Sequence, residues 1–329
     1  MIDDAEHRGG LKREADFPAF SIVTPSYNQG EFIEDTIKSV LSQGYPNLEY
    51  IVVDAGSTDD THLILAKYQG HIDKIIIEPD NGPADAIRKG WKSANGDILA
   101  YLNSDDIYLP GAIHKVADFF SRETHINMIC GNELRINSDG NVLGQSSIEH
   151  VDYCSLLSLC FIPQPSVFVR KNVLAEVGGI NPQMRFIFDF DLWVRIAKKY
   201  AIRCIPDLLS ATRWHDNTIT LKRRVDIVKE LDDLVNREIL SELCTVPFAK
   251  KRFILGKINR LMMNVNLEVG SHLSSLGYAC KSVYYLPTYA NISKVIRKQK
   301  QYVFPRRKLQ DNSNDNEELM THWSSYSPK

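Results

Sequence analysis

Residues 98–111, ILAYLNSDDIYLPG, join an apolar run to a cluster of polar side chains. The run from Ile98 to Leu102 predicts a short buried strand, because continuous apolar runs of this length are typical of strands covered on both faces. The strand is followed directly by Asn103, Ser104, Asp105 and Asp106. These side chains favour water, a metal ion or a proton, so a core strand that ends in them indicates a site at the edge of a sheet.

Three earlier segments repeat this arrangement of an apolar strand followed by polar or turn residues. The predicted strands begin at residues 20, 48 and 72, and they alternate with predicted helices over 30–43, 61–69 and 83–94. This alternation predicts parallel βαβ units and therefore an α/β sheet. Ligands of open parallel sheets bind beyond the carboxyl ends of the strands, so we expect the strand-end acids to collect along one edge.

The connections and the second half of the chain carry further local signals. Ser57 or Thr58 is expected to cap the helix over 61–69. Asp139-Gly140 predicts a hairpin turn between two strands. An amphipathic helix is expected over residues 221–240, and the chain from there to about residue 300 reads as helical and basic.

Composition excludes several protein classes. The chain has 329 residues, of which 43% are hydrophobic and 24% are charged, as in soluble globular proteins. Residues 1–17 have no apolar run of the kind found in signal peptides, and no apolar stretch approaches the ~20 residues of a membrane span. The six cysteines form no CxxC pair. We therefore expect a reduced, cytoplasmic protein whose cysteines are small core residues.

The charge is unevenly distributed along the chain. The net charge is −2, yet residues 248–308 contain thirteen Lys or Arg and one acid, Glu268. Aromatic and aliphatic residues interleave with these cations, so one interpretation is contact with an anionic membrane surface at the inner face of the plasma membrane. The other is a helical appendage with a solvated basic face. No nucleic-acid partner is expected, because no nucleic-acid-binding motif accompanies the charge.

These features divide the chain into four parts. Residues 1–17 are expected to form an N-terminal arm, 18–220 an α/β domain, and 221–305 a basic helical extension. Residues 306–329 are polar, and we expect them to be disordered.

Six segments between residues 20 and 220 carry a family resemblance. They are TPSYNQGEFIEDTIKSVLSQ, VVDAGSTDDT, EPDNGPADAIRKGW, LNSDDIYLPGAI, FDFDLWVRI and RWHDNTIT. In this order they resemble the inverting family-2 glycosyltransferases of polysaccharide-biosynthesis type. The resemblance implies the GT-A fold, a Rossmann-like and mostly parallel sheet with flanking helices. It also implies transfer of a sugar from a nucleotide-sugar donor, UDP-linked by expectation, to a hydroxyl of a glycan or lipid-linked saccharide acceptor, in surface or exported polysaccharide assembly.

The resemblance also implies roles for individual residues. Asp189 matches the catalytic base, and Asp105 and His215 match the ligands of a Mn²⁺ or Mg²⁺ ion. The acceptor side is expected to involve Gln164 and Asp191. The donor-binding residues are expected to be Pro25, Tyr27, Asn28, Asp54, Asp80, Asp85, Asn103, Ser104 and Arg213.

General chemistry agrees with these roles. A divalent cation neutralises a pyrophosphate leaving group, and oxygen ligands suit Mg²⁺ and Mn²⁺. An inverting transfer needs a base that takes the proton of the acceptor hydroxyl. The apolar residues before Asp189 are expected to raise its proton affinity by desolvation. A sugar nucleotidyltransferase is disfavoured, because the first strand is followed by no Gly-rich phosphate loop.

Structural interpretations remain open for several of these residues. Asp54 is alternatively a loop acid, Asp85 a partner of a helix N-terminus, and Asp191 a brace for the helix that it begins. The 103–106 segment is alternatively an Asx turn that ends a strand, and His215 a structural partner.

The sequence also departs from the family pattern. Asn103 stands where an Asp is common, Ala55 replaces a second acid, Phe188 a Glu, and Arg88 an Asn. These departures motivate an alternative function, a catalytically inactive GT-A module that binds nucleotide sugar or glycan for a partner.

Overall fold

The computed structural model describes residues 18–215, 218–241, 244–288, 291–295 and 297–298. Over these residues the strands form one sheet in the order β3-β2-β1-β4-β8-β6-β9-β5, with β7 added beside β6. The first four strands are mutually parallel, as the alternation of strands and helices predicts. They are β1 (Phe20–Ser26), β2 (Leu48–Asp54), β3 (Lys74–Ile77) and β4 (Ile98–Tyr101).

The second half of the sheet is mixed. β8 runs antiparallel to both β4 and β6, while β9 runs parallel to β6 and antiparallel to β5. The bounds of these strands are β5 (Ile107–Tyr108), β6 (Met128–Asn137), β7 (Val142–Gln145), β8 (Val167–Arg170) and β9 (Ile202–Trp214). β9 has 13 residues, and its C-terminal end leads to residues 213–215.

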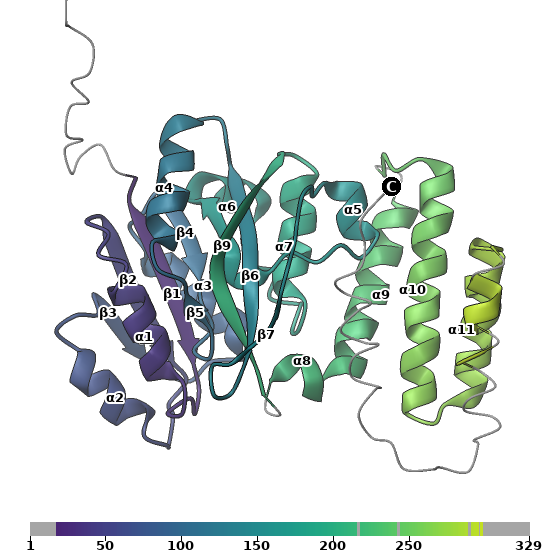
Figure 1. The fold of residues 1–329 in the computed structure, drawn as a ribbon. Helices are drawn as coiled ribbons and strands as arrows, with labels where there is room; N and C mark the ends of the chain where they lie inside the picture. The colour runs from purple at the N-terminus through teal and green to yellow at the C-terminus, as the bar shows by residue number, and fades with distance from the viewer. Residues whose placement is uncertain (1–17, 216–217, 242–243, 289–290, 296, 299–329) are drawn as a thin grey trace, which may run out of the picture.

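Helices cover both faces of the sheet, and the alternation of side chains along each strand divides the core in two (Figure 1). On β1, Phe20 and Ile22 pack with α1, α2 and α4, whereas Val23 packs with α3 on the other face. The latter face also carries α5, α6 and α7. These helices are α1 (Ile33–Leu41), α2 (Thr61–Tyr68), α3 (Pro83–Ser93), α4 (Ala112–Arg122), α5 (Tyr153–Leu157), α6 (Lys171–Val177) and α7 (Phe188–Ala197).

The C-terminal helices are not a separate globule. Leu231, Leu234 and Val235 of α9 and Ile254 of α10 belong to the same hydrophobic cluster as α3 and α7. Figure 1 shows α9, α10 and α11 side by side next to the sheet domain. The helices are α8 (Ile219–Lys222), α9 (Arg224–Leu240), α10 (Phe248–Glu268) and α11 (His272–Tyr285). The expected amphipathic helix is thus confirmed, with a start at residue 224.

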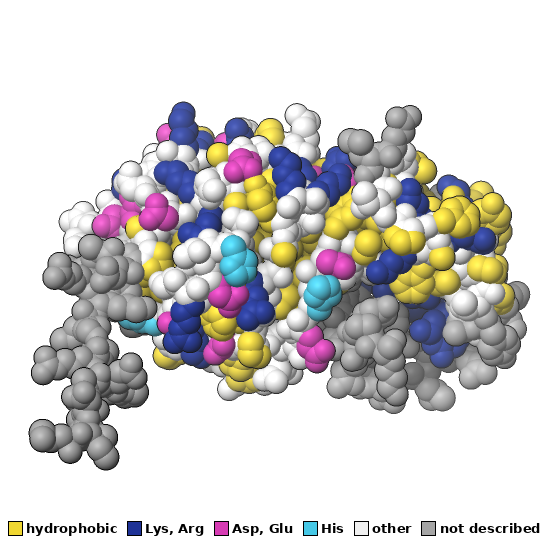
Figure 2. Space-filling view, turned by 90° about the horizontal axis from the view of Figure 1, so that it is seen from above, with side chains coloured by type: hydrophobic (Ala, Val, Ile, Leu, Met, Phe, Trp, Pro, Cys, Tyr) yellow, Lys and Arg dark blue, Asp and Glu magenta, His cyan; other side chains and the backbone are white. Residues whose placement is uncertain are grey.

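The surface of this end of the molecule differs from that of the sheet domain. Figure 2 shows basic and acidic side chains mixed over the sheet domain, whereas hydrophobic and basic side chains gather at the end formed by α10 and α11. Phe248, Leu273 and Tyr284 are among the exposed large hydrophobic residues there. None of the helices in the described ranges has both the length and the apolar character needed to cross a bilayer.

Two local expectations have clear outcomes. The hairpin between β6 and β7 is confirmed, with Gly140 at a φ of 84° in its turn. The expected cap of α2 by Ser57 or Thr58 is wrong, since the N-cap residue is Asp60 and its side chain makes no capping bond. Ser57 instead donates its hydroxyl to Asp54.

The cysteines are all free, as expected. Cys130 alone is fully buried, while Cys280 is exposed, so the expectation of core cysteines is only partly met. The N-terminal arm and the polar tail of the predicted domain plan lie outside the described residues.

Candidate active site

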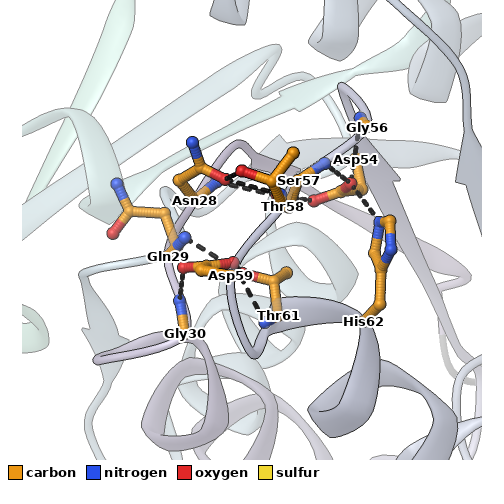
Figure 3. Close-up of polar contacts among 10 residues, drawn as sticks. All are labelled: Asn28, Gln29, Gly30, Asp54, Gly56, Ser57, Thr58, Asp59, Thr61 and His62. Carbon is orange, nitrogen blue, oxygen red and sulfur yellow. Dashed lines mark hydrogen bonds and ion pairs between the residues drawn. The ribbon is translucent and has the colours of Figure 1, made fainter.

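The loops that follow β1 and β2 are tied together by their own polar groups (Figure 3). Asn28, at a φ of 52°, donates its backbone N–H to the Ser57 hydroxyl at 2.7 Å, and its side-chain oxygen accepts the N–H of Thr58 at 2.8 Å. One step along, the Asp59 carboxylate accepts the N–H of Gly30 at 2.8 Å. The predicted nucleotide loop is therefore held by the loop after the neighbouring strand.

Asp54 is the centre of this network. Its side chain is fully buried, and it accepts the N–H groups of Gly56 and Ser57, the Ser57 hydroxyl and a contact from His62 Nε2 at 2.8 Å. Burial by itself would raise the pKa of Asp54, but the hydrogen bonds from Ser57 and His62 outweigh it and lower the pKa. In this arrangement the Asp54 carboxylate organises the loop, which matches the interpretation of Asp54 as a loop acid. Tyr27, directly after β1, is exposed.

Pro25 lies within β1, opposite Val53 of β2, and so fixes the course of the strand into this loop. Asp80 and Asp85 follow β3. The Asp80 carboxylate accepts the Gly82 N–H at 2.8 Å, and burial together with the nearby charges of Asp85 and Asp54 raises its pKa. Asp85 lies in the first turn of α3 and accepts the N–H of Asn81 at 3.2 Å, so it matches the expected partner of a helix N-terminus.

The loop after β4 brings together the two predicted metal ligands. His215 Nε2 lies 3.1 Å from Asp105 Oδ2, although the residues are 110 positions apart in the sequence. The imidazole packs against Phe32, with 4.7 Å between ring centroids, which fixes its orientation. Both side chains are mostly but not fully buried, at 10% and 18% exposed.

Asp106 and Arg213 stabilise this loop through hydrogen bonds. Asp106 is buried, and its carboxylate accepts the backbone N–H of Arg213 at 2.9 Å and the Asn103 amide at 3.2 Å. Burial and the adjacent Asp105 charge raise the pKa of Asp106 well above its usual value.

The Arg213 guanidinium is buried and already has partners. It donates to the backbone oxygens of Asp105 and Ser138, at 3.0 Å and 2.8 Å, and pairs with Asp35 at 3.2 Å. This geometry gives Arg213 a positioning role in the loop, whereas the sequence predicted a donor-binding residue.

Gln164, predicted to lie on the acceptor side, contacts the same loop. Its amide N–H donates to the backbone oxygen of Tyr101 at 2.9 Å, and its oxygen accepts from Asn103 at 3.2 Å. Ser104 is buried within the loop. Gln164 therefore lies where the structure joins the end of β4 to η2 (Gln164–Ser166).

Asp189 occupies the first turn of α7, near the end of β4. The Phe188 ring packs against Tyr101, with 6.1 Å between centroids, and Asp189 is close enough to Tyr101 to raise the pKa of that hydroxyl. Burial raises the pKa of Asp189 to about 6, against hydrogen bonds such as the one from the Phe190 N–H at 2.7 Å. A carboxylate poised near neutral pH suits general-base chemistry.

The chain is similar to known proteins in sequence and in fold. The sequence profile described as Glycosyl transferase family 2 matches residues 21–191, which is more than half of the chain. The chain belongs to glycosyltransferase family 2. A relative named putative teichuronic acid biosynthesis glycosyltransferase TuaG, from Bacillus subtilis, is 31% identical over 210 residues, covering 62% of this chain and 82% of TuaG.

Solved structures support the GT-A fold. S. aureus TarS aligns with a TM-score of 0.60 at 17% identity, over 89% of this chain and 56% of that one. A shorter TarS chain, residues 1–349, was solved with UDP-GlcNAc and aligns at 0.55 over 89% of this chain. Mannosyltransferase PcManGT from Pyrobaculum calidifontis, solved with GDP-Man and Mn²⁺, aligns at 0.58 and 15% identity over 93% of this chain and 84% of that one. At these identities the likeness establishes the fold alone.

The residues of this glycosyltransferase fit a divalent cation. In the described ranges, no group of three or more Asp, Glu, His or Cys side chains is arranged so that it could hold a metal ion by itself. Asp105 and His215 nevertheless offer one oxygen and one nitrogen ligand at the carboxyl edge of the sheet. That small protein donor set suits an ion whose remaining ligands are phosphate oxygens and water, as is usual for Mg²⁺.

Sequence reasoning missed two residues of the glycosyltransferase that position α7. The Glu230 carboxylate on α9 accepts the backbone N–H groups of Arg185, Phe186 and Ile187, at 3.0, 2.9 and 3.2 Å. Arg237, also on α9, pairs with Asp191 at 2.9 Å. Both lie at polar positions of an amphipathic helix, and no sequence signal distinguishes them from solvent-facing residues.

Asp191 is itself a brace. Its carboxylate is 1% exposed and is held by Arg195 at 2.8 Å on one oxygen and by Arg237 on the other. This is the bracing interpretation that the sequence left open beside an acceptor-side role.

Proposed function

We propose that this glycosyltransferase is a metal-dependent, inverting enzyme that transfers a sugar from a UDP-linked donor to a hydroxyl of a glycan or lipid-linked acceptor. The observation that carries the proposal is the Asp105–His215 contact of 3.1 Å, on the same sheet edge as a carboxylate whose pKa is near 6. These are the two chemical parts that the reaction requires, one on the leaving-group side and one on the acceptor side.

The leaving-group side follows from charge. Departure of the nucleoside diphosphate builds negative charge on the pyrophosphate, and a divalent ion held by Asp105 and His215 would neutralise it. Arg213 and Asp106 keep this loop in place through buried hydrogen bonds. The choice of UDP is supported by the TarS structure solved with UDP-GlcNAc, and that of Mn²⁺ by the PcManGT structure solved with this ion.

The acceptor side follows from proton affinity. Above pH about 6 Asp189 is ionised and takes the proton of the acceptor hydroxyl as the new bond forms. Inversion requires this base on the face of the sugar opposite the leaving group. Glu230 and Arg237 hold the first turn of α7, and so Asp189, in place.

The same proposal includes contact with an anionic membrane through the basic segment 248–308, of which residues 289–290, 296 and 299–308 lie outside the described ranges. Exposed Leu273, Leu276 and Tyr284 on α11 provide apolar side chains, with Lys281 on the same helix. Sedimentation with phosphatidylglycerol vesicles should carry the protein down, and phosphatidylcholine vesicles should not. Equal recovery with both lipids would remove the anionic-membrane part of the proposal.

The central test is calorimetric titration with UDP, GDP and dTDP, with and without Mn²⁺, on the native chain and on Asp105→Ala. We expect tight UDP binding that needs the metal and is lost in the variant. Asp118→Ala is the matched control, because Asp118 is a surface acid on α4 that pairs with Arg122. Metal-independent binding that survives in Asp105→Ala would contradict the metal assignment.

A turnover assay then separates an enzyme from a binding module. Release of nucleoside diphosphate from a UDP-sugar in the presence of acceptor extracts should occur with the native chain and stop in Asp189→Asn. Metal-dependent UDP binding without turnover under any donor and acceptor would favour the inactive module.

A further inference from the structure

A cleft of about 290 Å³ lies beside the segment that leads to Asp189. Residues 81–85 and Arg88, at the start of α3, form one wall, and Pro182, Met184, Arg185 and Phe186 form the other. Ile219 of α8 closes one side. The volume is close to the lower end of ligand pockets, roughly 300–1,000 Å³, which suits a single sugar residue.

Two arginines line this cleft, Arg88 from α3 and Arg185 from the segment that precedes α7. The carboxylate nearest to Arg88 is Asp85, at 3.7 Å, which is long for a charge-assisted hydrogen bond. Arg185 makes no ion pair with any residue in the described ranges, and its guanidinium lies 5.9 Å from the Phe186 ring centroid. Both side chains therefore keep donors for a ligand.

The other arginines near the site are already neutralised. Arg213 pairs with Asp35, and Arg195 and Arg237 share the two oxygens of Asp191. Acidic residues also lie at this edge: Asp80 follows β3, Asp105 follows β4, and Asp189 lies in the first turn of α7. Two open guanidinium groups at one corner of an acidic edge indicate a ligand with negative charge at that corner.

The shape of the two groups narrows the ligand further. A guanidinium presents a planar fork of N–H donors that matches a carboxylate through two parallel hydrogen bonds. Phe186, Met184 and Pro83 supply the apolar surface on which a sugar ring can pack.

We propose that this cleft binds a sugar residue that carries a carboxylate, as in a uronic acid. That residue is either the donor sugar or the acceptor sugar. The inference rests on the proposed function in one respect: the proposed function is the reason for taking the ligand to be a saccharide.

The experiment uses the full chain with Mn²⁺ in two arms. The donor arm compares the affinities of UDP-glucuronic acid, UDP-glucose and UDP by calorimetry. The acceptor arm compares methyl β-glucuronide with methyl β-glucoside by saturation-transfer NMR, with and without UDP. The variants are Arg88→Gln and Arg185→Gln, and Arg122→Gln on α4 is the control, because Arg122 is a surface arginine paired with Asp118.

One arm should show a preference for the carboxylate. We expect about tenfold or tighter binding of the glucuronate compound than of its neutral partner, lost in Arg88→Gln and in Arg185→Gln and kept in Arg122→Gln. UDP alone should bind equally to all four proteins. A preference in the donor arm identifies the donor sugar, and a preference in the acceptor arm alone identifies the acceptor.

Failure of this inference differs from failure of the proposed function. If UDP binds with metal but neither arm shows an arginine-dependent preference, the carboxylate cleft is overturned and the proposed function stands. If no nucleotide binds but methyl β-glucuronide binds through Arg88, the cleft stands and the proposed function falls.

Discussion

The loop after β2 and the loop after β4 both end a buried strand in carboxylates, but they use them differently. Both oxygens of Asp54 accept hydrogen bonds from the loop that follows it. Among the described residues, the Asp105 carboxylate contacts His215 alone. The difference teaches that a position at the end of a strand does not by itself assign a role to an acid. A carboxylate whose oxygens already accept hydrogen bonds from its own loop builds that loop, whereas one with few such bonds is open to a ligand.

The largest expected effect concerns Asp189, the other carboxylate of this edge that the proposal gives a chemical role, in the first turn of α7. Asp189→Asn removes the proton acceptor and should lower kcat by about 10²- to 10⁴-fold, because general-base catalysis contributes on that order. In the native enzyme kcat/KM should rise with pH and level off above about 6, where Asp189 is ionised. A steady-state pH profile checks this, and an acid limb that persists in Asp189→Asn would assign it to another group.

Replacing Asp54, whose oxygens accept hydrogen bonds from its own loop, should lower the stability of the protein. Asp54→Asn keeps the shape but removes the charge that accepts from Ser57 and His62, so we expect a loss of about 2–3 kcal/mol in the free energy of unfolding at pH 7. Because the pKa of Asp54 is lowered in the folded state, this contribution is present at neutral pH and lost as the pH falls through that pKa.

Urea unfolding of Asp54→Asn and of Asp60→Asn, an exposed acid in the same loop, measures that difference. A stable Asp54→Asn with weakened UDP binding would reverse the assignment and make Asp54 a ligand-contacting residue.

Asp189 should also differ from Asp54 in the sign of its effect on stability, because replacing Asp189 should raise the free energy of unfolding. Since the pKa of Asp189 is raised to about 6, the folded state is penalised once the group is ionised. Asp189→Asn should therefore be more stable than the native chain by about 1–2 kcal/mol at pH 7. The advantage should shrink as the pH falls from 6 to 4. Unfolding curves at pH 4.5 and 7 check this, and equal stability at both would place Asp189 in water.

The smallest effect concerns a residue that acts through others. Glu230→Gln weakens the acceptor of three N–H groups before α7, and we expect about a tenfold loss in kcat with metal-dependent UDP binding unchanged, since hydrogen bonds to charged groups contribute about 1.5–3 kcal/mol. Lys229→Gln, the exposed neighbour, is the control. A parallel loss of UDP affinity would indicate a general structural defect in place of a displaced base.

Much of the fold followed from the sequence because it depends on local patterns. Apolar runs and helical spacing predicted β1 to β4, α1 and α3, and the rule on carboxyl ends predicted where the acids would collect. The partners of each carboxylate could not be predicted, because they come from segments far away in the sequence. Asp105 meets a histidine 110 residues away, and the loop before Asp189 meets Glu230 on a helix of the C-terminal part.

The partners of charged groups also explain the expectations that the structure altered. Arg213 looked available for phosphate, since a sequence does not reveal that Asp35 and two backbone oxygens already occupy it. Likewise Ser57 looked like a helix cap but donates to Asp54.

The two arginines on Asp191 have a consequence for how this enzyme can be recombined. One comes from α7 itself and the other from α9, so a single buried carboxylate joins α7 to the C-terminal part. Chimeras that exchange the C-terminal helices with those of a relative should work only when α7 is exchanged with them. Otherwise the graft leaves a buried charge half-paired. The junction of such a chimera should therefore lie before α7, which begins at Phe188, well ahead of residue 248, where the basic segment starts.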